Sequence, residues 1–122
     1  MKQITEDYCS FEIAKLLKEK GFDTPCKQAY FNGSLVDYTM YGFCDGELLD
    51  CPSQSLALKW LREVHNIYID ILTYTTGKNN QFRWVGYDNG RLFSQEEGKT
   101  IYFESYKKAV EAALKYTLEN LI

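Results

Sequence analysis

The sequence predicts an α+β fold in which an antiparallel meander of three to five strands is flanked by three helices. Apolar residues recur at helical spacing in three segments, and alternating segments joined by short polar loops lie between the second and the third. Strands joined by short loops pair antiparallel, because a parallel pair needs a long crossover. We expect the order α-(ββ)-α-β-β-β-α in a single domain over residues 1–122. Residues 1–50 supply an N-terminal helix and a weak β region, and residues 51–122 supply an α-β-β-β-α core.

The first helix is predicted to begin after Ser10, whose side chain can accept a hydrogen bond from the first turn. Gly21 is expected to end it in the left-handed conformation, and Phe22 can then fold back on Leu17. The pattern over residues 26–50 is weaker. There, "YFNGSLVDY" predicts a hairpin that turns at Asn32-Gly33, and "TMYGFCDGELLD" could be strand, loop or both.

The second helix is predicted to begin near Pro52 or Ser53, because proline is tolerated in the first turn and serine caps it. Asn66 is the expected left-handed C-cap, after which the chain enters a strand directly. The third helix is predicted to begin at Ser105, which can cap it. The expected buried faces of these two helices are Ala57, Trp60, Leu61 and Val64 in the second, and Val110, Ala113, Leu114, Thr117 and Leu121 in the third.

The strands between these helices alternate in polarity. The segment that begins at Ile67 and the segment "QFRWVGY" both have period two, and "DNG" at 88–90 predicts a turn. Residues 91–93 extend a further strand, and "KTIYFE" at 99–104 is predicted to be a last short strand. One face of this sheet is expected to be open, or covered by residues 1–50, and to carry Tyr68, Asp70, Tyr74, Arg83 and Tyr87.

The composition excludes several function classes. The net charge of −3 and the pI near 5.2 argue against a strongly electrostatic nucleic-acid binder. No apolar run reaches the roughly 18 residues of a membrane helix, and the start lacks the regions of a signal peptide. We therefore expect a cytoplasmic protein with no membrane partner. The cysteines lack the short-spaced pairs of a zinc site and are expected to be small, mostly buried residues: Cys9, Cys26, Cys44 and Cys51.

The chain shows no persuasive catalytic set. His65, the only histidine, lies at the predicted end of a helix and is interpreted as a capping or surface residue, because a general base needs a nucleophile or carboxylate beside it. Gly42 and Gly46 do not have the spacing of a phosphate-binding loop. Cys51 precedes a helix N-terminus, which could lower a thiol pKa. We expect no enzymatic activity, no cofactor and no metal.

Tyrosine is abundant, with ten in the chain. Many tyrosines are explained by the preference of this residue for strands. An exposed cluster of them is also typical of protein-binding surfaces. The sequence therefore suggests a candidate protein interface made of Tyr30, Phe31, Tyr38, Tyr41, Tyr68 and Tyr74.

A nucleic-acid interface is the alternative. The order helix, three strands, helix over residues 53–121, with two lysines at the start of the last helix, resembles the double-stranded RNA-binding domain, whose lysines at this place hold phosphates. Glu111 and the acidic balance of the chain depart from that pattern, and the lysines also fit a solvated helix face. The candidate nucleic-acid contacts are Lys59, Arg62, Lys107 and Lys108.

A closer likeness covers residues 9–23 and 51–71 and, loosely, the final helix. The segments "SLALKWLREVHNIYIDI", "FRWVGY" and "SYKKAVEAALKYTLENL" resemble the phage ABA-sandwich domain. "FEIAKLLKEKGFD" and "PSQSLALKWLREVHNI" are similar to segments of uncharacterised small proteins of Bacteroides phages and mobile elements. The resemblance implies a sheet between helical layers, and it carries no activity and no catalytic residue.

These observations lead to an expected function. The chain is expected to be a small accessory protein of a phage or mobile element that binds a host or phage protein. The alternative is a nucleic-acid-binding module with the topology of the double-stranded RNA-binding domain. An unprotected edge strand of a three-stranded meander can pair with another chain, so a monomer or an edge-strand dimer is expected.

Overall fold

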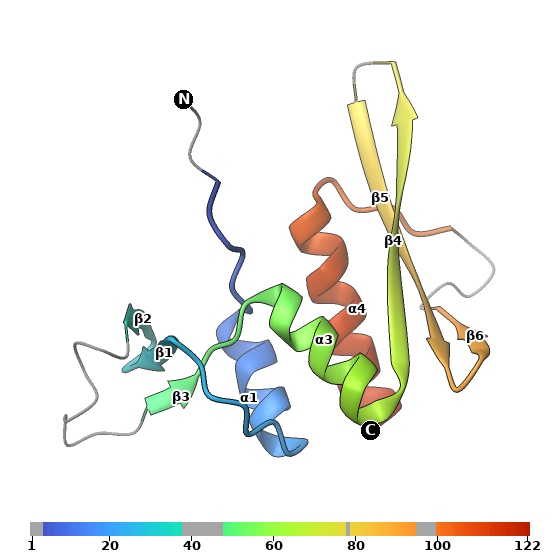
Figure 1. Cartoon of the computed structure of the whole chain (residues 1–122). Helices are drawn as coiled ribbons and strands as arrows, with labels where there is room; N and C mark the ends of the chain where they lie inside the picture. Colours follow the sequence, from blue (N-terminus) through green and yellow to red (C-terminus); the bar gives the residue numbers. More distant parts are fainter. Residues whose placement is uncertain (1–3, 38–47, 78, 95–99) are drawn as a thin grey trace. The chain divides into compact units, whose positions relative to one another are not determined.

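The chain has the predicted α+β fold, and its described residues form three helices and two three-stranded antiparallel sheets. It divides into two compact units, Met1–Ala57 and Leu58–Ile122 (Figure 1). The boundary between the units falls inside helix α3 (Gln54–His65), whose first turn belongs to the first unit. The computed structural model describes residues 4–37, 48–77, 79–94 and 100–122.

In the first unit, helix α1 (Phe11–Glu19) begins and ends as predicted. The Ser10 side chain accepts a hydrogen bond, 3.3 Å long, from the backbone N–H three residues later. Gly21 has a φ of +95°. The Phe22 N–H then donates to the Leu17 carbonyl at 2.9 Å, and Phe22 is buried. These contacts fix the direction in which the chain leaves the helix.

The sheet of the first unit has the strand order β2-β1-β3. The predicted Asn32-Gly33 turn is confirmed: both residues have positive φ, 50° and 81°, and they form the two-residue loop of a hairpin. Tyr30 lies opposite Leu35 on one side and Leu49 on the other. Helix α1 packs beside β3. The strands are β1 (Gln28–Phe31), β2 (Ser34–Asp37) and β3 (Leu48–Asp50).

The start of α3 is held by the N-terminal segment of the same unit. The Cys9 N–H donates to the Pro52 carbonyl at 3.0 Å, and the Gln54 N–H donates to the Asp7 carbonyl at 2.8 Å. Ser53 caps the helix as predicted, because its Oγ accepts a hydrogen bond, 3.1 Å long, from the backbone N–H three residues later. Residues 7–9 and 52–54 thus form a short antiparallel pairing.

In the second unit, the end of α3 differs from the prediction at one residue. Trp60 and Leu61 are buried as predicted, but Val64 is 61% exposed. His65 takes the place next to Trp60 instead, with ring centroids 4.7 Å apart in an edge-to-face arrangement. Asn66 then ends the helix with a φ of 56°, as predicted.

The second sheet has the order β4-β5-β6 and is dominated by one long hairpin. The predicted turn at Asn89-Gly90 is confirmed, with φ angles of 51° and 85°. The predicted last strand is wrong. In the described part of that segment, residues 100–104, only Phe103 pairs, through an isolated bridge to Phe82. The strands are β4 (Ile67–Thr76), β5 (Asn79–Asp88) and β6 (Arg91–Phe93).

Helix α4 (Tyr106–Asn120) covers one face of this sheet (Figure 1). It begins as predicted, because the Ser105 Oγ accepts a hydrogen bond from the Lys108 N–H at 3.1 Å. Trp84 of β5 is buried beneath it, and its ring centroid lies 5.5 Å from that of Tyr116. The buried residues of the helix are Ala109, Val110, Ala113, Leu114, Thr117 and Leu118, whereas the predicted Leu121 is half-buried.

The ring of Phe93 occupies the space that a side chain at Gly86 of β5 would fill. Gly86 lies opposite Phe93 of β6, and a methyl group on Gly86 would meet the Phe93 ring at 2.2 Å. The same ring lies 5.8 Å from Trp84 and 6.2 Å from Tyr116, centroid to centroid. The absence of a side chain at Gly86 therefore lets Phe93 join the aromatic core under α4.

Candidate functional site

Three large apolar side chains form a row across one face of the β4-β5-β6 sheet. Tyr68 lies opposite Tyr87 across β4 and β5, and Tyr87 lies opposite Leu92 across β5 and β6. Residues directly opposite each other in an antiparallel pair point to the same face. Trp84, at the other parity of β5, points to the buried face. The row therefore lies on the face turned away from α4.

A second group lies further along the same face, towards the end of the hairpin. Leu72 and Tyr74 follow at two-residue intervals along β4 and so point the same way. The bridge between Phe82 and Phe103 brings Tyr102 to the side of β5 that lies opposite β4. The ring centroids of Tyr74 and Tyr102 lie 5.7 Å apart, so the two tyrosines meet above the middle strand.

We call the combined set the Tyr face: Tyr68, Leu72, Tyr74, Tyr87, Leu92 and Tyr102. Its members are 38% to 66% exposed. The charged side chains that the register places on this face within the three strands are Asp70 and Arg83, so it carries little net charge.

A groove of about 700 Å³ adjoins the Tyr face at Tyr102. Amide side chains from the start of β5, such as Asn80 and Gln81, line one part of it. Phe82 and Tyr106 line another part, with their rings edge to face at 6.2 Å. Amides and aromatic rings together suit a polypeptide, which offers both backbone polar groups and apolar side chains.

The structure brings together only part of the predicted tyrosine interface. Tyr68 and Tyr74 lie on the Tyr face. Tyr30 and Phe31 are half-buried in strand β1 of the first unit. The Tyr30 hydroxyl donates to the Cys9 carbonyl at 2.8 Å, which gives this tyrosine a structural role. The remaining two predicted residues lie outside the described residues: Tyr38 and Tyr41.

The sequence alone predicts only Tyr68 and Tyr74 of the Tyr face as interface residues. Tyr87 is predicted on the sheet face that is open or covered by residues 1–50 but is not linked to binding, and Leu72, Leu92 and Tyr102 are not among the predicted interface residues. The signal that could have found three of them is the strand register. Once "DNG" is taken as a two-residue hairpin turn, Tyr87 must lie opposite Leu92. Tyr102 has no such signal, because it lies outside any strand.

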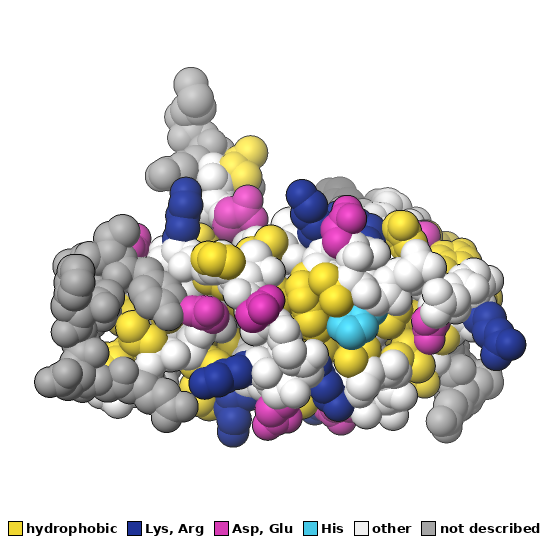
Figure 2. Space-filling model, turned by 60° about the horizontal axis from the view of Figure 1, so that its bottom comes forward, with side chains coloured by type: hydrophobic (Ala, Val, Ile, Leu, Met, Phe, Trp, Pro, Cys, Tyr) yellow, Lys and Arg dark blue, Asp and Glu magenta, His cyan; other side chains and the backbone are white. Residues whose placement is uncertain are grey.

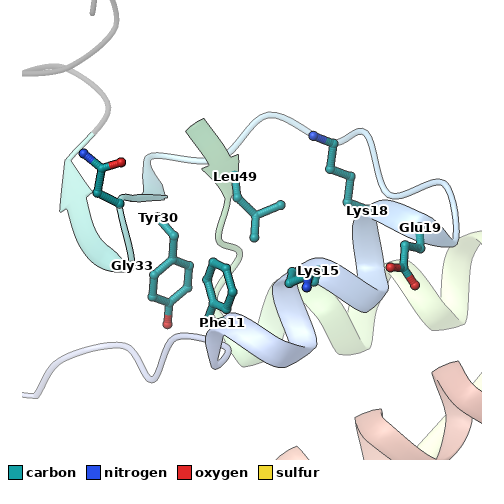
Figure 3. A pocket seen from close by; sticks show the side chains of 8 residues that line it. Phe11, Lys15, Lys18, Glu19, Tyr30, Gly33 and Leu49 are labelled. Carbon is teal, nitrogen blue, oxygen red and sulfur yellow. The ribbon is translucent and has the colours of Figure 1, made fainter. Parts of the chain in front are cut away.

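The first unit has a cavity of its own, of about 390 Å³, between α1 and its sheet (Figure 3). Phe11 and Tyr30 form an edge-to-face pair at 5.4 Å on one side of it, and Leu49 points into the same space. Lys15 stands 5.7 Å from the Phe11 ring centroid, within cation–π range. An apolar floor with Lys15, Lys18 and Glu19 at its rim suits an apolar side chain.

The described cysteines make structural contacts. Cys9 and Cys51 are buried, and the Cys51 Sγ–H points to the Cys9 carbonyl at 3.2 Å. Burial raises the pKa of the Cys26 thiol to about 11, and Asp50 and Cys51 add to the effect through charge. At neutral pH this thiol stays protonated, which makes it a poor nucleophile.

His65 lies at the surface among hydrophobic side chains (Figure 2). Its Nε2 is buried and has no hydrogen-bond partner, and its ring packs against Trp60. The histidine therefore acts as part of the apolar packing at the end of α3.

The candidate nucleic-acid contacts all belong to the second unit and are exposed: Lys59, Arg62, Lys107 and Lys108. Lys108 forms an ion pair with Glu104, and this hydrogen bond and charge lower the pKa of Glu104. The two units differ in charge. The first has five basic and nine acidic residues, a formal charge of −4, and the second has nine and eight, a formal charge of +1.

Neither a metal site nor a membrane helix is found where the structure describes the chain. In those residues no three or more histidine, cysteine, aspartate or glutamate side chains are grouped to hold a metal ion. None of the described helices is long and apolar enough to cross a membrane. Comparison with models of known protein families, with curated proteins and with solved structures finds no match to this chain.

Proposed function

We propose that this chain acts by binding another protein, and that the Tyr face is the docking surface. The observation that carries the proposal is the gathering of six large apolar side chains, 38% to 66% exposed, on one sheet face. Large exposed groups of apolar side chains are uncommon on monomeric proteins and mark interaction sites. Tyrosine suits such a surface because it buries a large area with little loss of conformational freedom.

The chemistry of the face indicates what kind of partner fits. It carries little net charge, and Asp70, Arg83 and Gln81 lie among its apolar side chains. A folded protein that offers apolar side chains together with polar groups to pair with Asp70 and Arg83 is complementary to it. The resemblance to phage domains implies that this partner is a host or phage protein in the cytoplasm.

Nucleic acid is the second candidate, because exposed aromatic side chains on a sheet can also stack bases. The nearly neutral face argues against it, since such binding usually needs basic groups along the phosphate backbone. Of the four candidate contacts, Lys108 is already paired with Glu104.

The test uses capture from a lysate of the native host with matched surface variants. Two exposed residues of the Tyr face are changed together, Tyr74→Ser and Leu92→Ser. The control is Leu35→Ser, an exposed leucine in the sheet of the first unit. We expect a protein that the wild type and the control retain and that the double variant loses by roughly tenfold or more, since interface aromatics contribute about 2 kcal/mol.

Two results would contradict the proposal. Equal capture by all three proteins would place the binding surface elsewhere. Capture that nuclease abolishes, and that Lys107→Gln with Lys59→Gln weakens in a salt-dependent way, would support the nucleic-acid candidate instead. Circular dichroism of each variant checks that the changes leave the fold intact.

A further inference from the structure

The long strand β4 has an outer edge that no described strand covers. The sheet order β4-β5-β6 places β4 at one side of the sheet, paired only with β5. Its ten residues, Ile67–Thr76, run in unbroken register with Asn79–Asp88. An uncovered strand of this length presents a row of backbone donors and acceptors to any other chain.

The direction of those backbone groups follows from hydrogen bonds on β5. The Phe82 N–H donates to the Phe103 carbonyl at 2.9 Å, and the Phe103 N–H donates back to the Phe82 carbonyl at 2.6 Å. Phe82 therefore turns both of its backbone groups away from β4. Its partner on β4 is Thr73, so this is a non-hydrogen-bonded pair, and Thr73 turns its own N–H and carbonyl to the outer edge.

Because this direction alternates along a strand, every second residue of β4 does the same. Five residues present their backbone N–H and carbonyl to the outer edge: Ile67, Ile69, Ile71, Thr73 and Thr75.

This edge lacks the features by which sheet proteins usually prevent pairing. β4 contains no proline and no lysine, and its unbroken register leaves no bulge. Six of its ten residues are β-branched, which favours extended pairing. Its only charged residue is Asp70. Any partner strand therefore has to avoid placing a second carboxylate directly opposite Asp70.

We propose that β4 pairs with β4 of a second copy of this chain, antiparallel about a two-fold axis at Ile71. In a symmetric antiparallel pair the residue on the axis lies opposite itself. With Ile71 on the axis, Ile69 lies opposite Thr73 of the second copy and Ile67 lies opposite Thr75 of the second copy. All five outward residues of each copy are then hydrogen-bonded, which gives about ten new bonds, more than any shifted register allows.

The side chains fit the same register. Tyr68 lies opposite Tyr74 of the second copy, which forms two aromatic cross-strand pairs on the exposed face. Asp70 lies opposite Leu72 of the second copy. Moving the axis by one residue to Asp70 would set two carboxylates directly opposite each other, which is destabilising. The edge is thus self-complementary in one register, and this is why a second copy is the favoured occupant.

The dimer has a consequence for the Tyr face. The two sheets join into one of six strands, and the Tyr faces of the two copies become one continuous surface across the axis. The proposed pairing does not rest on the proposed function, because its hydrogen bonds come from the backbone edge of β4, although Tyr68 and Tyr74 of the exposed face add cross-strand contacts. Thr73→Pro alters the edge and no side chain of the Tyr face, so loss of dimerisation can be observed separately from loss of partner capture.

The first test is sedimentation velocity on the full chain with two variants of one residue. Thr73→Pro removes an N–H that faces the outer edge and is not used within the sheet, a place where an edge strand tolerates proline. Thr73→Ala keeps this N–H. We expect wild type and Thr73→Ala to dimerise between about 10 µM and 1 mM, and Thr73→Pro to dimerise at least tenfold more weakly.

A second measurement covers the case in which Thr73→Pro fails to fold. Backbone amide exchange of the wild type is followed by NMR at low and high protein concentration. The amides of Ile69, Ile71 and Thr73 should become more protected as concentration rises, whereas those of Leu72 and Tyr74, already bonded to β5, should not change. A monomer at about 1 mM, equal weakening by both Thr73 variants, or protection that does not alternate would overturn the proposal.

Discussion

The two sheets of this chain contain the same type of turn but differ in the surroundings of their tyrosines. Each contains an Asn-Gly pair with positive φ at both residues, at Asn32-Gly33 and at Asn89-Gly90. In the first sheet the strands have three or four residues, and the hydroxyl of Tyr30 is bonded to a backbone carbonyl. In the second sheet two strands have ten residues, and its tyrosines stand on an exposed face.

The difference shows that the turn, which sets the register, does not by itself decide which tyrosines are exposed. An Asn-Gly turn sets which residues lie opposite each other over the first few pairs. Strand length and the position of the covering helix then decide which of those residues meet solvent. α4 covers only one face of the long hairpin, so the other face of an antiparallel sheet stays open. Tyrosines that look alike in sequence therefore take different roles.

The largest effect is expected at the covered face of the second sheet. Trp84→Ala should lower the free energy of unfolding by about 3–5 kcal/mol, because it removes a buried indole and leaves a cavity beside Tyr116 and Phe93. Urea denaturation followed by circular dichroism measures this loss. The matched change on the open face, Tyr74→Ala, should cost less than about 1 kcal/mol. Similar losses for both variants would show that the open face is packed in the folded chain.

The next effect tests how the third strand is attached. Gly86→Ala should lower the free energy of unfolding by about 1–3 kcal/mol, because the new methyl group overlaps the Phe93 ring. Phe93→Leu frees part of that space, so Gly86→Ala should cost less in the Phe93→Leu background than in the wild type. A double-mutant cycle by urea denaturation measures the coupling. Additive effects would mean that the ring does not cover Gly86.

A smaller effect compares one tyrosine from each sheet. Tyr30→Phe removes the hydroxyl that donates to the Cys9 carbonyl at 2.8 Å, and we expect a loss of about 0.5–1.5 kcal/mol. Tyr74→Phe removes an exposed hydroxyl, and the change in unfolding free energy should stay within about 0.5 kcal/mol. Thermal unfolding of both variants beside the wild type gives the comparison. The reverse order would refute the structural role given to Tyr30.

The smallest effect is a pH dependence in the first unit. The pKa of the Cys26 thiol is raised from its ordinary value of 9.0 to about 11 in the folded chain, mainly by burial. Between these values unfolding releases a proton, so stability should fall as the pH rises from about 9 to about 11. Cys26→Ala should show a shallower fall over this range, because other groups titrate equally in both proteins. Parallel curves of unfolding free energy against pH would refute the raised pKa.

The helix ends and turns of this fold could be predicted from the sequence because they depend on a few neighbouring residues. Ser10, Ser53 and Ser105 each accept the hydrogen bond expected of a cap. Asn66 and Gly21 each adopt the left-handed conformation that ends a helix. The α+β class followed from the same local patterns, since two periods in one chain define two kinds of element.

The remaining features depend on contacts between distant residues, which local patterns do not specify. Leu48–Asp50 becomes a strand by pairing with β1 across an intervening stretch. Val64 has the helical spacing of a buried residue, yet His65 takes its place beside Trp60. Tyr102 joins the candidate site through one isolated bridge. A cluster of tyrosines in sequence was therefore a poorer guide to the exposed face than the register of two strands.

The pairing of residues 7–9 with 52–54 has a consequence for how the chain is made. These segments hold the start of α3 through bonds such as Cys9 N–H to the Pro52 carbonyl. The first unit cannot close until residue 54 has left the ribosome, although its hairpin and α1 can form earlier from local contacts. A nascent chain halted before that point would expose the apolar side of α1. Ribosome-associated chaperones would meet that side as an unprotected surface.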